Sequence, residues 1–97
     1  MLELRPAVAA FAELMESRLQ ANDHKGGWSD CTFGYLWQRL GEERQELYRA
    51  LVRRKRSWPE VIHEAVDVAN YAMMIADLAL SRSPMADIEE SGEAPDA

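Results

Sequence analysis

Two pairs of carboxylates have the types and the spacing that could do chemistry in this 97-residue chain. Glu43 and Glu46 form one pair, and Glu64 and Asp67 form the other. Residues three apart lie on the same side of an α-helix, so each pair presents its oxygens together. If the two helices run antiparallel, these four acids converge into the oxygen-rich site that hard divalent cations prefer. Because Mg²⁺ commonly bridges carboxylates to phosphates, the implied substrate is a di- or triphosphate.

The position of these acids on their helices favours a site over an ordinary surface. At about 100° per residue, Glu43 falls beside Leu36 and Leu47 at the edge of an apolar stripe, where a carboxylate needs a partner or a cation. The polar arc of the later helix has no Lys or Arg before Arg82, which predicts a half-buried acidic surface without compensating charge. The alternative is that each pair belongs to a solvated helix face, as most isolated pairs do. The polar arc comprises Glu60, His63, Glu64, Asp67, Asn70 and Asp77.

Three helices are expected to position these residues. Apolar side chains at helical spacing predict helices over residues 6–21, 31–54 and 57–81. Residues 22–30 form the predicted loop before the second helix, with the break at Gly26 and its neighbouring glycine.

Local signals mark the expected start of each helix. Pro6 suits a first helical turn. Ser29 or Asp30 is the predicted N-cap of the second helix, because either side chain can accept a hydrogen bond from a free backbone amide. Ser57 and Glu60 have the spacing of a capping box for the third helix.

The chain is predicted to be one all-α domain, a helical bundle of three main helices over residues 1–82, followed by an acidic and flexible C-terminal tail over 83–97. A chain of 97 residues is marginally stable alone, yet 47% of this one is hydrophobic. We therefore expect a four-helix core completed by oligomerisation, as a homodimer or homotetramer.

Composition excludes several classes of partner. A net charge of −6 and a pI near 4.8 argue against binding to a nucleic-acid backbone, which requires a basic patch. We expect no membrane association, because no apolar run approaches the ~20 residues of a membrane span and no signal peptide opens the chain. Cys31 is the only cysteine and leaves no internal disulfide. A cytoplasmic setting fits these features.

A second metal chemistry is possible from the sequence. Glu60 and His63 form an E-x-x-H pair, the ligand pair of di-iron helical bundles. Such bundles need two pairs, and this chain has one, since its other histidine, His24, lies in the predicted loop. Only a dimer could supply the second.

The carboxylate spacing resembles the metal motif of a known family. Glu43-x-x-Glu46, followed after 17 residues by Glu64-x-x-Asp67, is similar to the motif of the MazG-like all-α nucleoside triphosphate pyrophosphohydrolases, which include dimeric dUTPases and dCTP pyrophosphatases. The segments KGGW, YLWQRLGEERQEL and EAVDVANYAMMIAD resemble short members from phages and integron cassettes, some of which act on dATP and dGTP. The likeness covers residues 22–77.

The resemblance implies a reaction and its cofactor. A nucleoside triphosphate and water would yield the monophosphate and pyrophosphate, with purine deoxynucleotides (dGTP and dATP) as the first expectation. Glu43, Glu46, Glu64 and Asp67 would bind Mg²⁺, or Mn²⁺ in its place, with two or more ions per site. Either Glu43 or Glu46 would act as the catalytic base. The alternatives are a dCTP or dUTP pyrophosphatase, or a noncatalytic helical interaction module.

Three further residues are candidates for substrate binding. Lys25 would reach a phosphate, or else be a solvent-exposed loop lysine. Trp28 would stack on the base, or else pack in the core or a subunit interface. Asn70, one turn after Asp67, would hydrogen-bond the sugar or base, or else be satisfied by water.

Overall fold

The computed structural model describes residues 2–82, which form three α-helices and one short 3-10 turn, without a strand. In chain order these are α1 (Pro6–Ala21), η1 (Asp23–Lys25), α2 (Phe33–Val52) and α3 (Trp58–Arg82). The predicted all-α fold with three main helices is confirmed over this part of the chain. The predicted tail, residues 83–97, lies outside the described residues. No helix within residues 2–82 combines the length and apolarity that crossing a lipid bilayer requires.

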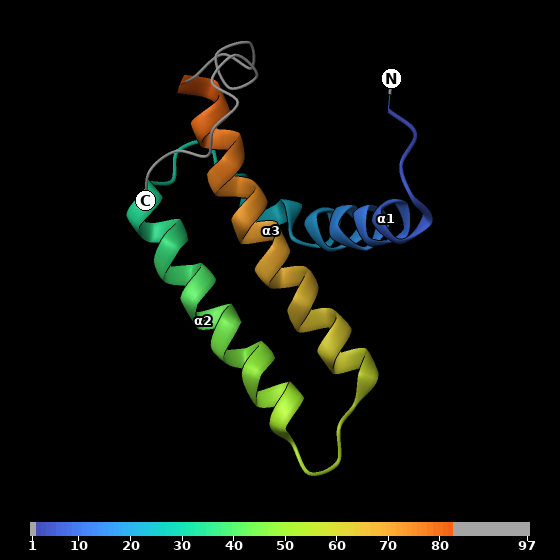
Figure 1. The fold of residues 1–97 in the computed structure, drawn as a ribbon. Coiled ribbons are helices and arrows are strands. Elements are labelled where there is room, and N and C mark those ends of the chain that lie inside the picture. Colours follow the sequence, from blue (N-terminus) through green and yellow to red (C-terminus); the bar gives the residue numbers. More distant parts are fainter. Residues whose placement is uncertain (1, 83–97) are drawn as a thin grey trace, which may run out of the picture.

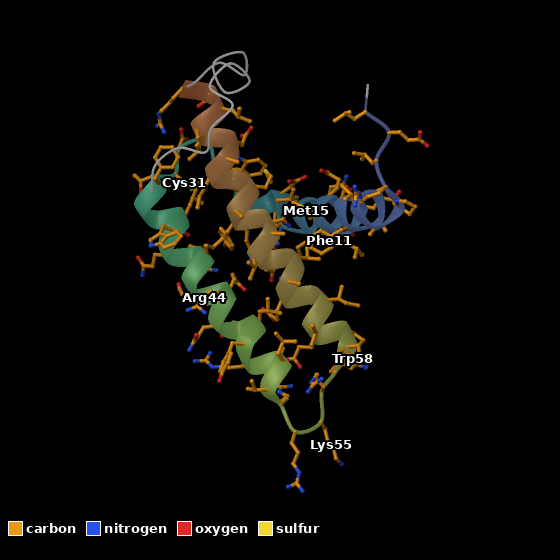
Figure 2. All side chains as sticks on the ribbon, in the orientation of Figure 1. Phe11, Met15, Cys31, Arg44, Lys55 and Trp58 are labelled. Carbon is orange, nitrogen blue, oxygen red and sulfur yellow. The ribbon has the colours of Figure 1, made fainter. Side chains whose placement is uncertain are left out.

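The helices form a hairpin with a third helix laid across it. α2 and α3 run antiparallel in contact, and α1 crosses α3 at a steep angle (Figure 1). Phe11 and Met15 lie where α1 meets α3 (Figure 2). Lys55 lies in the short connection at the far end of the hairpin.

The start of α2 differs from the prediction. Thr32 is its N-cap, and the Thr32 hydroxyl accepts a hydrogen bond from the Tyr35 amide at 3.0 Å. The predicted caps Ser29 and Asp30 are wrong, because both lie in a tight turn before the cap. Ser, Asp and Thr all cap helices well, so residue type alone does not select the cap. The turn before the helix leaves Thr32 in the capping position.

The other boundaries follow the sequence more closely. α1 covers the predicted range, whereas α2 ends at Val52, because the backbone of Arg53 is already extended with ψ 139°. Only half of the predicted capping box forms. The Glu60 amide donates to the Ser57 hydroxyl at 3.4 Å, but the Glu60 carboxylate pairs with Arg53 at 2.6 Å.

The hydrophobic core is thin. The buried apolar side chains are Leu36 and Ala50 of α2 and Val66 and Leu78 of α3. α1 has no buried residue. Large apolar side chains elsewhere remain exposed, among them Trp37, which is 69% exposed, and Trp58, which is 59% exposed. Two helices in contact cover only one stripe of each other, so these side chains are left uncovered in the single chain.

Candidate metal centre

Three of the four predicted carboxylates meet between α2 and α3. One oxygen from each of Glu43, Glu64 and Asp67 lies within 4.8 Å of the others. The antiparallel hairpin brings the middle of α2 beside the middle of α3, and Glu43 projects from the edge of the α2 stripe as its position predicts. The Glu43 and Asp67 side chains are only 15% and 14% exposed. Within residues 2–82, no other group of three or more acidic, histidine or cysteine side chains is so close.

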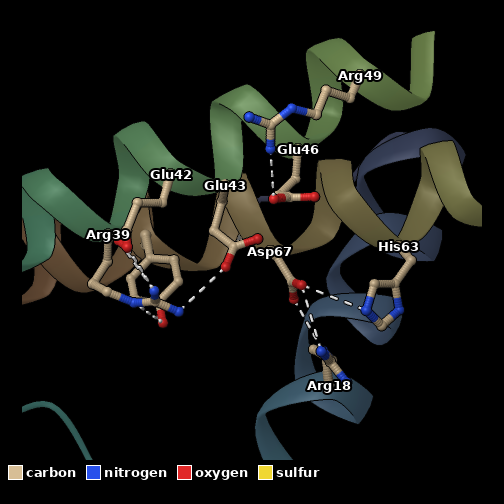
Figure 3. A network of polar contacts seen from close by, with 9 residues as sticks. Arg18, Arg39, Glu42, Glu43, Glu46, Arg49, His63 and Asp67 are labelled. Carbon is tan, nitrogen blue, oxygen red and sulfur yellow. Dashed lines mark hydrogen bonds and ion pairs between the residues drawn. The ribbon is translucent and has the colours of Figure 1, made fainter. Parts of the chain in front are cut away.

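Glu46 lies outside this group. Its carboxylate accepts a hydrogen bond from Arg49 at 3.0 Å, and its side chain is 51% exposed (Figure 3). Three residues after Glu43, it lies about 60° further round the helix. The role of Glu46 as a ligand or base therefore stays a prediction, which requires its side chain to leave Arg49.

The carboxylates repel one another. Burial raises the pKa of Glu43 above its ordinary value, and the negative charges of Asp67 and Glu64 raise it further, while Arg39 opposes them. A hydrogen bond with Glu64 adds to the increase. Such a cluster is stabilised by a proton or by a cation.

Asp67 has side-chain partners that the sequence did not indicate. Nε of Arg18, on α1, lies 3.0 Å from one Asp67 oxygen, and Nε2 of His63 lies 3.5 Å from the other (Figure 3). The predicted uncompensated acidic arc is therefore wrong at Asp67. α3 has no Lys or Arg before Arg82, but α1 supplies Arg18, which lies 49 residues before Asp67 in the sequence.

Arg39 compensates the other side of the cluster. Its guanidinium donates to the Tyr71 hydroxyl at 3.3 Å, to Glu42 at 3.1 Å and to Glu43 at 3.4 Å. It also lies over the Tyr71 ring, 5.4 Å from the centroid. Sequence reasoning missed Arg39, although its spacing of three and four residues from two glutamates is a helical ion-pair signal.

Two of the three acids, Glu43 and Asp67, border a pocket of about 250 Å³ among the end of α1, the η1 loop, α2 and α3. All three predicted substrate-binding residues line it, as do both arginines. This volume lies slightly below the range of about 300–1,000 Å³ of typical ligand sites. The lining includes Arg18, Lys25, Trp28, Arg39, Glu43, Asp67 and Asn70.

Asn70 is the most informative of these residues. It is 3% exposed, and its amide nitrogen donates to the Met15 carbonyl at 3.3 Å. This bond fixes the orientation of the Asn70 amide, because exchanging its nitrogen and oxygen would bring the side-chain oxygen against the Met15 carbonyl oxygen. The side-chain oxygen is buried and has no hydrogen-bond partner among the described residues. A buried acceptor without a donor is destabilising, so this oxygen is suited to a ligand hydroxyl or amine.

Trp28 and Lys25 occupy the loop wall of the pocket. The Trp28 indole donates a hydrogen bond to the Asp77 carboxylate at 3.0 Å and so joins the loop to α3. Asp77, an acid of the predicted polar arc, therefore serves to hold this loop. Lys25 is exposed at the pocket and has its ammonium available to an anion. Gly26 turns the chain at φ 88°, a conformation that glycine adopts without strain.

The di-iron alternative is not supported by the geometry. Glu60 pairs with Arg53, whereas His63 lies beside Asp67. Neither belongs to the group of clustered ligands found in residues 2–82.

The donor set fits a hard divalent cation. It consists of carboxylate oxygens, whose mutual repulsion a cation relieves, and such oxygens are the ligands that Mg²⁺ accepts in proteins. Comparison of the chain with models of known protein families, with curated proteins and with solved structures finds no match.

Glu43→Gln is expected to raise the melting temperature near neutral pH in the absence of divalent cations, by about a few °C. A carboxyl whose pKa is raised on folding stabilises the protein while protonated, and this contribution is lost as the pH rises through the raised pKa. Glutamine resembles the protonated form, so the difference from wild type should vanish toward acidic pH. Thermal unfolding between pH 4 and 8 with a chelator measures this. The exposed Glu46→Gln is the matched control, and a lower melting temperature for Glu43→Gln at pH 7 would contradict the prediction.

Proposed function

We propose that this chain is a Mg²⁺-dependent, MazG-like pyrophosphohydrolase that converts a nucleoside triphosphate and water into the monophosphate and pyrophosphate. The observation that carries the proposal is the meeting of Glu43, Glu64 and Asp67 beside a pocket that Glu43, Asp67 and Asn70 line, together with the buried, unpartnered side-chain oxygen of Asn70. Acids that hold a cation account for the phosphate end of such a substrate. A buried acceptor accounts for a hydroxyl or amine at the other end.

The proposed chemistry divides between the acids and water. Glu43, Glu64 and Asp67 would hold two or more divalent cations, and Glu46 would complete the set once its side chain leaves Arg49. When held there, Mg²⁺, or Mn²⁺ in its place, would supply activation of water and neutralisation of charge on the phosphates. Either Glu43 or Glu46 accepts the proton of the attacking water, at a carboxylate oxygen.

The pocket supplies the groups for the rest of the nucleotide. The Asn70 oxygen accepts from a sugar hydroxyl, and Trp28 provides an aromatic surface beside the base. Lys25 offers a point charge to a phosphate. Purine deoxynucleotides are our first choice of substrate, and the reaction is placed in the cytoplasm, or the host cytoplasm if a phage encodes the protein.

Product analysis tests this function directly. The protein is incubated with each of the eight common ribo- and deoxyribonucleoside triphosphates and Mg²⁺, and pyrophosphate is scored against orthophosphate. We expect monophosphate and pyrophosphate, highest with dGTP or dATP, and none with a chelator. Orthophosphate alone would exclude cleavage at the α-phosphorus. No turnover, together with no thermal shift by any triphosphate and Mg²⁺, would favour a noncatalytic interaction module.

We infer that a second copy of the chain covers the exposed apolar face of α2, as a homodimer or as the unit of a homotetramer. This apolar face is defined by Phe33, Trp37, Tyr48 and Leu51, all of which are exposed. Helical geometry places them on the flank of α2 away from Glu46 and Arg39, so a partner there leaves the pocket open. Two hairpins joined along this face would form a four-helix core.

A further inference from the structure

The acid cluster is flanked by two arginines that are held very differently. Arg39 donates to Tyr71 and Glu42 as well as to Glu43, so three partners fix it at the pocket wall. Arg18 donates to Asp67 alone among the described residues, at 3.0 and 3.5 Å. Its side chain is also 36% exposed. Arg18 can therefore leave its carboxylate without breaking any other bond.

Arg18 and a divalent cation compete for the same oxygens. Asp67 is one of the clustered acids, and both of its oxygens face Arg18. A cation that binds Asp67 replaces the positive charge that Arg18 provides, which removes most of the attraction between the two side chains. Arg18 also lines the pocket proposed for the nucleotide, and its planar fork suits phosphate oxygens.

We propose that Arg18 is a substrate-positioning residue that neutralises Asp67 in the cation-free protein and passes to the ligand's phosphates when a divalent cation binds Asp67. The inference rests on the proposed function and goes beyond it, because it assigns opposite roles to one residue in two states. Arg18 opposes the cation when the cation is alone and supports the nucleotide when both are present. An arginine that only neutralised Asp67 would oppose the cation without supporting the nucleotide. An arginine that only bound phosphate would support the nucleotide without opposing the cation.

The first test is the binding of Mn²⁺ alone to the full chain, measured by titration calorimetry or by electron paramagnetic resonance. Arg18→Gln should bind Mn²⁺ about three- to tenfold tighter than wild type, which is the range expected when a partly exposed ion pair no longer competes. Arg18→Lys keeps the positive charge but loses the planar guanidinium with its paired donors, so its Mn²⁺ affinity should lie closer to that of wild type.

The second test is the binding of an α,β-methylene deoxyguanosine triphosphate analogue at saturating Mn²⁺. Arg18→Gln should bind this analogue about 10- to 100-fold more weakly, the loss expected for charged hydrogen bonds to phosphate. Arg18→Lys should recover part of that affinity. Circular dichroism confirms that α1 remains helical in both variants.

Arg53→Gln is the matched control, because Arg53 also pairs with a carboxylate of α3, at 2.6 Å from Glu60, but lines neither the acid cluster nor the pocket. It removes the same charge and should change neither affinity by more than about twofold. Unchanged or weaker Mn²⁺ binding by Arg18→Gln would overturn the inference, as would tighter Mn²⁺ binding with unaltered analogue binding. If wild type itself binds no Mn²⁺, the proposed function fails together with the inference.

Discussion

Asp67→Asn is expected to lower kcat for nucleotide hydrolysis about 10³-fold or more while leaving the fold intact. Asp67 belongs to the acid cluster, is 14% exposed and borders the pocket, so its charge acts where phosphate charge must be neutralised. Loss of one such charge removes several kcal/mol of transition-state stabilisation, and each 1.36 kcal/mol is about tenfold in rate. Steady-state release of pyrophosphate at saturating Mg²⁺ measures the effect.

Glu60→Gln provides the control for this substitution. Like Asp67→Asn, it neutralises a carboxylate of α3 that pairs with an arginine from another segment, here Arg53. It lies outside the acid cluster, so kcat should stay within about twofold of wild type, in keeping with the small contribution of a surface ion pair. Turnover by Asp67→Asn near the wild-type rate would remove Asp67 from the catalytic site.

Trp37→Lys is expected to weaken self-association about 30-fold or more. Trp37 is the most exposed large side chain of the apolar face, at 69%. A tryptophan at the centre of an interface commonly contributes about 2 kcal/mol or more, and the variant would additionally bury an unpaired ammonium. Sedimentation equilibrium or light scattering over a range of protein concentrations measures the shift.

Leu14→Lys tests the location of that interface. Leu14 is a large apolar side chain of α1 that is also exposed, at 45%, but it lies outside the apolar face of α2. Self-association should therefore survive this substitution. Dissociation by Leu14→Lys but not by Trp37→Lys would place the interface on α1, and a wild-type monomer at every concentration would exclude the second copy.

The helices and most of the acid cluster could be predicted because both depend on local periodicity. Helical spacing places Glu43 beside Leu36, on the edge of the apolar stripe of α2. An antiparallel hairpin then brings Glu43 close to Glu64 and Asp67. Glu46 shows the limit of this reasoning. Its spacing from Glu43 satisfies the motif, as that of Asp67 from Glu64 does, but its side chain pairs with Arg49 and lies outside the cluster.

The remaining features depend on tertiary arrangement that no local pattern contains. Nothing in α1 indicates which part of α3 it crosses, so the pairing of Arg18 with Asp67 across 49 residues could not be foreseen. Trp37 illustrates the same difficulty for packing. An apolar flank on a helix shows that something should cover it, but not whether its own chain or another does so.

The docking of α1 has a consequence for the order in which the molecule is assembled. α1 is synthesised before the other described helices, yet it buries no residue of its own, and the hydrogen bonds that join it to α3 run from Arg18 to Asp67 and from Asn70 to the Met15 carbonyl. Both partners belong to α3, the last described helix to leave the ribosome. The nascent α1 therefore has nothing to dock on until α3 emerges, so the pocket is a late product of translation.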